Sequence, residues 1–165
     1  MLAAARLDGS APAALVAFLD FSPHGSIRAL SRVVGLTHSG AVRLADRLVA
    51  AGYLERHPGV DARSLTLTLT PSGRALAQRI RAARADAVTQ AFAELSGDQR
   101  AALAKICDQL IITLTRLRLE QRAAGGEPAG GALCRMCDFA ACGRHEGNCP
   151  AARAAEDLAQ TEPQR

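Results

Sequence analysis

The feature that most constrains the fold is a change of hydrophobic period in the first half of the chain. Residues 27–34 and 37–52 place their apolar side chains at helical spacing and are separated by a short turn. Residues 64–70 instead read SLTLTLT, a strict alternation of leucine and hydroxyl residues that is typical of a strand with one buried face. Residues 53–56 predict its partner strand, and the segment 57–63, which contains Pro and Gly, predicts the turn of a hairpin.

Residues that mark helix ends agree with this division. Ser26 and Thr37 are types that cap helix N-termini, and Gly35 is the type that ends a helix. Two short helices joined by such a turn form a helix-turn-helix, and a hairpin directly after it makes a winged helix. The expected fold class is therefore mostly α with a small β-hairpin wing.

Longer helices are expected around this motif. An apolar run that starts at Pro12 predicts a core helix, Thr70 caps a helix that reaches about Leu95, and Ser96 with Gln99 fits a capping box for another. The stripe of the first long helix is Leu76, Ile80, Val88 and Phe92. The stripe of the second is Leu103, Ile106, Cys107, Leu110, Ile111, Leu114 and Leu117. This second stripe is wider than a small domain needs, so we expect dimerisation through the terminal helices, with Cys107 buried in the apolar stripe.

Composition and charge narrow the possible functions. The 165-residue chain is 48% hydrophobic, which excludes disorder throughout. No stretch reaches the roughly 18 uninterrupted apolar residues of a membrane span, and we expect a cytoplasmic protein with no membrane partner. The formal net charge is +4, and residues 25–75 carry seven Arg against three acidic residues. This excess favours a surface that faces a polyanion.

The order of motifs in residues 26 to about 120 resembles the multiple antibiotic resistance regulator (MarR) family of bacterial winged-helix repressors. The stretch VGLTHSGAVRLADRLVAAGYLERHPGVDARSLTLTLTPSGRAL contains a recognition helix, a DRL–AGYLER junction, an acidic-x-Arg wing and a closing LT–G. The resemblance implies a homodimer that binds a near-palindromic operator in double-stranded DNA. It also implies a small-molecule effector and no enzymatic activity.

The second helix of the motif supplies the expected DNA contacts, because residues of its first two turns face the bases in a major groove. These residues are Thr37, His38, Ser39, Gly40, Val42 and Arg43. Arg43 is suited to a guanine edge, and Thr37 and Ser39 are suited to phosphates. A glycine at position 40 is explained either by a close approach of DNA to the backbone or by packing against the preceding helix.

Two further arginines belong to the expected interface. Arg47, one turn after Arg43, is either a phosphate contact or the partner of a nearby carboxylate such as Asp46 or Glu55. At the wing, Arg63 is expected to enter the minor groove with Asp61 orienting it, as the family resemblance also implies; the alternative is a solvated arginine with no specific contact.

Four of the five cysteines lie within sixteen residues near the C-terminus, with the spacing C-x2-C-x4-C-x6-C. Cys134, Cys137, Cys142 and Cys149 are the predicted metal ligands, because four thiolates in one segment can wrap a single centre. Structural zinc is the first candidate and an iron-sulfur cluster the alternative, with His145 a possible replacement ligand. Thiols that bind no metal, or that oxidise reversibly, stay open as a third interpretation.

The sequence predicts a division into three parts. Residues 1–124 form a winged-helix DNA-binding and dimerisation domain, 125–133 a flexible linker, and 134–165 a Cys-rich metal-binding extension. The main functional alternative is a winged-helix module that binds protein and not DNA. A thiol oxidoreductase that uses Cys134 and Cys137 is disfavoured, because no strand precedes this C-x-x-C pair.

Overall fold

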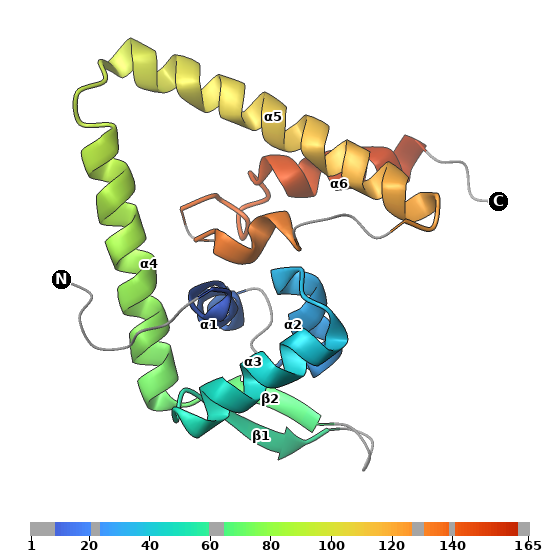
Figure 1. Cartoon of the computed structure of the whole chain (residues 1–165). Coiled ribbons are helices and arrows are strands. Elements are labelled where there is room, and N and C mark those ends of the chain that lie inside the picture. Colours follow the sequence, from blue (N-terminus) through green and yellow to red (C-terminus); the bar gives the residue numbers. More distant parts are fainter. Residues whose placement is uncertain (1–8, 21–23, 60–64, 127–130, 139–140, 162–165) are drawn as a thin grey trace. The chain divides into compact units, whose positions relative to one another are not determined.

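The computed structural model describes residues 9–20, 24–59, 65–126, 131–138 and 141–161 (Figure 1). Its elements are α1 (Ala11–Asp20), α2 (Ile27–Val34), α3 (His38–Ala50), β1 (Leu54–Pro58), β2 (Leu65–Leu69), α4 (Pro71–Ala91), α5 (Gly97–Ala123), the 3-10 helix η1 (Leu133–Met136) and α6 (Pro150–Thr161). They form two compact units. Unit 1 comprises Met1–Ala85 and Gly130–Met136, and unit 2 comprises Asp86–Ala129 and Cys137–Arg165.

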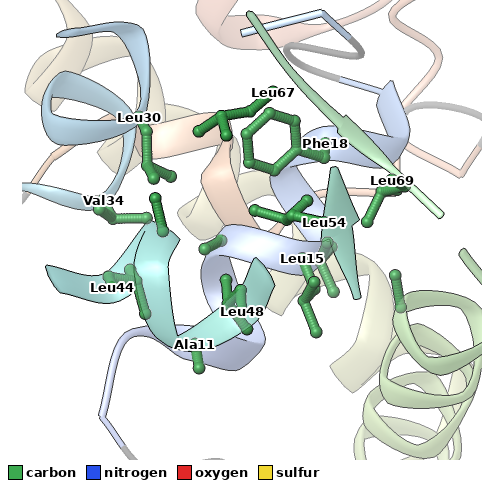
Figure 2. Close-up of a cluster of buried hydrophobic side chains, with 14 of the residues drawn as sticks. Ala11, Leu15, Phe18, Leu30, Val34, Leu44, Leu48, Leu54, Leu67 and Leu69 are labelled. Atoms are coloured by element: carbon green, nitrogen blue, oxygen red, sulfur yellow. The ribbon is translucent and has the colours of Figure 1, made fainter. Parts of the chain in front are cut away.

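Helix α1 is apolar on all sides and forms part of the core of unit 1. Its residues 14–18 are at most 4% exposed, as expected for a helix without a polar face. Leu15 and Phe18 belong to one cluster with Leu48 of α3 and with Leu54 and Leu67 of the hairpin (Figure 2). The burial of α1 therefore joins the helix-turn-helix and the wing in a single core.

The helix-turn-helix is capped where the sequence predicts. The Ser26 hydroxyl accepts a hydrogen bond from the Ala29 N–H at 3.1 Å, and Thr37 Oγ1 accepts one from the Gly40 N–H at 3.2 Å. Gly35 ends α2 in the left-handed conformation with φ of 72°, which a glycine adopts without steric cost. The interpretation of two short helices around a tight turn is confirmed.

The hairpin is antiparallel, and its register pairs Leu54 with Leu69 and Pro58 with Leu65. Leu67 and Leu69 are buried while Leu65 is 52% exposed, so the alternating pattern directs the two leucines nearest α4 into the core. Gly25 exchanges two backbone hydrogen bonds with Leu67, of 3.1 and 2.8 Å, and thereby extends the sheet toward α2.

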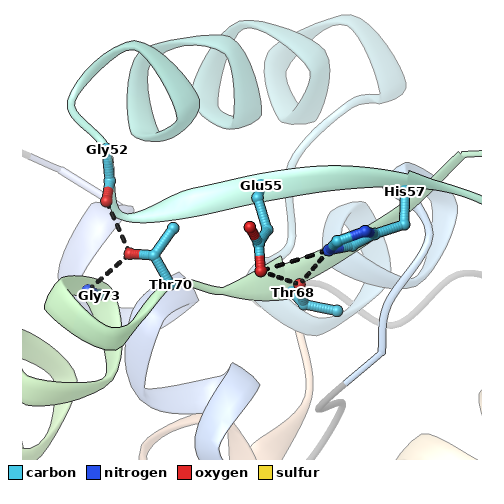
Figure 3. A network of polar contacts seen from close by, with 6 residues as sticks. All are labelled: Gly52, Glu55, His57, Thr68, Thr70 and Gly73. Carbon is cyan, nitrogen blue, oxygen red and sulfur yellow. Dashed lines mark hydrogen bonds and ion pairs between the residues drawn. The ribbon is translucent and has the colours of Figure 1, made fainter.

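The end of the wing is joined to α4 by a polar network around Thr70 (Figure 3). Thr70 Oγ1 donates to the carbonyl oxygen of Gly52 at 2.6 Å and accepts from the Gly73 N–H at 3.0 Å. Ser72 Oγ donates to the same Gly52 carbonyl at 2.8 Å. One threonine thus caps α4 and links it to the end of α3.

Unit 2 contains the end of α4, together with α5 and α6. Helices α5 and α6 pack against each other. The predicted capping box is present, because Ser96 Oγ accepts from the Gln99 N–H and the Gln99 side chain accepts from the Ser96 N–H. Cys149 and Ala154 are buried at the start of α6. None of the helices among the described residues is long and apolar enough to cross a membrane.

Several boundaries differ from the sequence-based expectation. Helix α4 ends at Ala91, four residues before Leu95; beyond it the Ala93 and Leu95 N–H groups donate to carbonyls three residues earlier, as in turns. Cys107 is exposed in the single chain, so its prediction as a buried residue is wrong. Residues 131–133, assigned to a linker, belong to unit 1, whereas 127–130 lie outside the described residues. The units therefore divide the chain differently from the three predicted parts.

At Gly73, the backbone at the start of α4 packs closely against the backbone that precedes the wing. A Cβ added there would lie 1.9 Å from the carbonyl oxygen of Tyr53, a backbone atom that cannot rotate away. We expect Gly73→Ala to lower the free energy of unfolding by about 1–3 kcal/mol, as overpacking does. Gly97→Ala, where no atom lies within 4 Å, is the matched control and should change it by less than about 1 kcal/mol. Equal losses in urea denaturation would contradict this account.

Candidate nucleic-acid interface

Helix α3 has one buried face and one exposed face. Ala41, Leu44, Ala45 and Leu48 are buried in unit 1. In the first turns of α3, His38, Ser39 and Arg43 are exposed, and Gly40 and Val42 are half-buried; Arg47, in the last turn, is also exposed. The predicted DNA-contact residues of this helix therefore lie away from its buried stripe, and all but Arg47 lie in its N-terminal half.

The first turn of α3 is organised by its own cap. Thr37 is exposed, but its hydroxyl oxygen already accepts from the Gly40 N–H and lies 3.3 Å from Ser39 Oγ. The two hydroxyl groups are thus held next to one another at the helix N-terminus. Backbone N–H groups and a positive dipole end at such a terminus favour a phosphate.

Gly40 was given two explanations from the sequence. An added Cβ would meet Thr37 Oγ1 at 3.2 Å and Leu36 Cβ at 3.6 Å, and no atom of α2 is among these nearest neighbours. The close contact is therefore with the capping turn and not with the preceding helix. This leaves the outer side of Gly40 for a ligand to approach.

The carboxylates suggested as partners of Arg47 have other partners. Asp46 forms an ion pair with Arg56 of β1, and Glu55 lies 3.3 Å from both His57 Nε2 and Thr68 Oγ1. The Asp46–Arg56 pair links α3 to the first strand of the wing. Arg43 and Arg47 are exposed on the same helix.

Sequence reasoning missed this ion pair and the Glu55–His57–Thr68 network. His57 Nε2 is 3.0 Å from Thr68 Oγ1, and Thr68 is the cross-strand neighbour of Glu55 (Figure 3). The strand register would have revealed the Glu55–Thr68 contact, because residues paired across a hairpin have adjacent side chains. The Asp46–Arg56 pair has no comparable sequence signal, since helix and strand meet only in the folded core.

A pocket of about 620 Å³ opens beside α3. It is lined by Gly9, Ser10, Leu36, Gly40, Arg43, Asp46 and Arg47. Two arginines and one carboxylate thus border a space large enough for a small organic molecule.

The predicted wing residues Asp61 and Arg63 lie outside the described residues. The strands on either side of this segment, β1 and β2, are described. Their role in DNA binding stays a prediction.

The four clustered cysteines are thiols and not disulfides in this structure. Cys134 belongs to η1 in unit 1, whereas Cys137, Cys142 and Cys149 belong to unit 2. Among the described residues, no three side chains of His, Cys, Asp or Glu are gathered so that they hold a metal ion. The metal site therefore stays a prediction from spacing and thiolate chemistry.

Comparisons with known proteins agree with this geometry. Residues 9–64 match the MarR family model. The solved structures that resemble the chain include reduced MarR from E. coli, with 22% identity and a TM-score of 0.56 over 63% of this chain and 77% of that one. A MarR family protein from Bacillus stearothermophilus has 17% identity and a TM-score of 0.60, over 67% and 77%. FabT from Streptococcus pneumoniae in complex with DNA has 19% identity and a TM-score of 0.60, over 68% and 78%. No curated protein matches the chain.

The fold is a winged helix-turn-helix, the same fold as in these solved MarR structures. The family whose model matches is MarR, over residues 9–64 of this chain. The resemblance inferred from the sequence is confirmed. Because MarR proteins are transcriptional regulators and not enzymes, the oxidoreductase alternative is set aside.

Proposed function

We propose that the protein is a dimeric bacterial repressor that works in the cytoplasm and binds a near-palindromic operator. The observation that carries this proposal is the exposed side of α3, where Ser39 and Arg43 follow the capped helix start and Arg47 is exposed in the last turn. A helix of this kind fits the major groove and reads base edges from its first turns. The structural neighbour FabT was solved with DNA, which supports the same mode of binding.

The proposed contacts divide between positioning and reading. Thr37, Ser39 and Arg47 contact phosphates, which fix the register of the protein on the duplex. Arg43 donates two hydrogen bonds to a guanine edge, and His38, Gly40 and Val42 lie against neighbouring bases. At the wing, Arg63 enters the minor groove with Asp61 beside it.

Arg43→Ala tests the base contact. We expect it to weaken binding to a duplex selected from a random pool by about 5- to 150-fold, because one bidentate contact contributes about 1–3 kcal/mol. Arg100→Ala removes the same charge from an exposed site on α5 and serves as the control. Fluorescence anisotropy at several salt concentrations measures both variants and wild type.

The logarithm of the wild-type binding constant should fall linearly with the logarithm of the salt concentration, since DNA releases counterions when the protein binds its phosphates. If Arg43→Ala and Arg100→Ala weaken duplex binding equally, Arg43 does not make the proposed base contact. A wild-type chain that shows no salt-sensitive duplex binding would instead favour a module that binds protein.

The dimer proposal rests on the apolar side of α5. Ile106, Leu110, Leu114 and Leu117 are about half exposed in the single chain and recur at intervals of three or four residues. A row of exposed leucine and isoleucine side chains along one helix is typical of an interface between subunits. A second copy of the chain is the occupant expected from the twofold symmetry of a near-palindromic operator.

Leu110→Asp is expected to shift the protein from dimer to monomer, because a carboxylate would have to be buried in the apolar interface. Gln109→Asp introduces the same charge at the adjacent exposed position and should leave the dimer intact. Sedimentation velocity measures the mass of each variant. A Leu110→Asp chain that remains dimeric at micromolar concentration would exclude α5 as the interface.

The regulator is also proposed to respond to a small-molecule effector and to a metal. The pocket beside α3 is the candidate effector site, since a ligand there contacts Arg43 and Arg47 directly. The metal site consists of Cys134, Cys137, Cys142 and Cys149 holding one zinc ion. Four thiolates satisfy its tetrahedral preference, and an iron-sulfur cluster is the alternative occupant.

Anaerobic purification followed by metal and sulfide analysis tests the cysteine centre. We expect about one zinc per chain, no visible absorption band, and loss of the metal when the four cysteines are replaced by Ser. Cys107→Ser is the control, because this cysteine lies outside the cluster and should not affect zinc content. A visible absorption band together with iron and sulfide would show that the centre is an iron-sulfur cluster. Wild-type protein without any metal would exclude both the zinc ion and the cluster.

A further inference from the structure

The exposed side of α3 carries one carboxylate among its arginines. Asp46 is the only acidic residue of this helix, and it lies three residues after Arg43 and directly before Arg47. All three side chains are exposed, and all three line the same pocket beside α3. A negative charge therefore stands on the surface that is proposed to face the phosphates and base edges of DNA.

Helical spacing makes Asp46 a possible partner of Arg43. Side chains three residues apart are neighbours on a helix, and opposite charges at this spacing attract each other. A carboxylate and the O6/N7 edge of guanine each bind two N–H groups of an arginine. An ion pair between Asp46 and Arg43 would therefore occupy the donors that base recognition requires.

The structure gives Asp46 a different partner. Nη2 of Arg56 forms an ion pair with Oδ1 of Asp46, and Arg56 belongs to β1 and not to α3. No ion pair joins Arg43 to another residue in the part of the chain that the structure describes. The carboxylate thus pairs with the wing strand, and the Arg43 guanidinium keeps its donors for a ligand.

The strand register explains why Arg56 reaches α3. Arg56 is paired with Leu67 across the hairpin, so the two side chains leave the same face of the sheet. Leu67 and Leu54 on this face belong to the core that they share with α3. Glu55 and His57 alternate to the other face, where they contact one another. Arg56 is therefore the charged side chain of β1 on the face that packs against α3.

Stability does not account for this ion pair. The side chains of Arg56 and Asp46 are 36% and 53% exposed, and ion pairs open to water in this way contribute little to the free energy of folding. The pair does determine where charge stands on α3. It neutralises Asp46 and holds it by a residue outside the helix.

We infer that Arg56 is a positioning residue for DNA reading, which holds the Asp46 carboxylate away from Arg43 and cancels its charge beside the duplex. This inference rests on the proposed DNA-binding function. Arg56 acts through Asp46 and not by a base contact of its own. Without Arg56, the carboxylate repels the phosphates and pairs with Arg43, so that both the affinity and the preference for guanine fall.

A double-mutant cycle in the full-length chain tests this role. Arg56→Gln should weaken binding to the selected duplex by about five-fold or more. It should also reduce discrimination against a duplex in which the guanine whose preference Arg43→Ala abolishes is replaced by adenine. Asp46→Asn/Arg56→Gln removes the carboxylate as well and should restore both quantities to within about two-fold of wild type.

Two controls accompany the cycle. Asp46→Asn alone should bind at least as tightly as wild type, because it removes the negative charge and leaves Arg56 in place. Arg100→Gln removes one positive charge from an exposed site on α5 and should change neither affinity nor discrimination by more than about two-fold. A loss of the same size in Arg100→Gln and Arg56→Gln would show an effect of net charge alone and would overturn the inference.

The restored binding of the double variant is the decisive result. A double variant as weak as Arg56→Gln would overturn the inference, because Arg56 would then bind DNA itself or merely join α3 to β1. An Arg56→Gln chain that binds like wild type would overturn it too. The urea midpoint of Arg56→Gln should match that of wild type, and a clearly lower midpoint would assign the pair to stability instead.

Failure of the inference is distinguishable from failure of the proposed function. Wild type that shows no salt-sensitive duplex binding would refute the DNA-binding function, and the role of Arg56 with it. Wild type that binds the duplex, together with a double variant that is not restored, would refute only the role of Arg56.

Discussion

The left-handed turn at Gly35 is the constraint on which the candidate interface depends. Both the Gly35 N–H and the Leu36 N–H return to the Ser31 carbonyl, so the chain reverses within two residues before Thr37 starts α3. In the resulting arrangement Leu44 and Leu48 are buried in the core of unit 1, while Arg43 and Arg47 are exposed.

The other end of α3 is held by equally short-range contacts. The Gly52 carbonyl accepts from Thr70 and Ser72, and the absence of a side chain at Gly73 lets α4 begin against Tyr53. The wing, the end of α3 and the start of α4 therefore meet around a few backbone atoms. The order of motifs recognised in the sequence has this physical basis, because Gly35 and Gly73 have backbone positions that suit glycine, and Thr37 and Thr70 cap the helices that follow them.

The candidate site was predictable where it depends on local chemistry. The cap at Thr37 and the exposed turn with Ser39 and Arg43 follow from helix periodicity alone, since the apolar positions determine which side faces the core. The Asp46–Arg56 ion pair was not predictable in this way, because α3 and β1 approach only through their shared core. The same holds for the hydrogen bond from the Ala132 N–H to the Val33 carbonyl, which joins segments distant in sequence.

By itself, the sequence determined the winged-helix order, the helix caps at Ser26, Thr37 and Ser96, and the strand pairing, because caps and periodicity act over a few residues. Only the tertiary structure decided that Gly131 and Ala132 belong to the DNA-binding unit and that Cys107 is exposed in the single chain. A glycine-rich segment has no periodicity that reveals its neighbours. Its place depends on the free Val33 carbonyl at the end of α2, to which a backbone N–H far along the chain can bind.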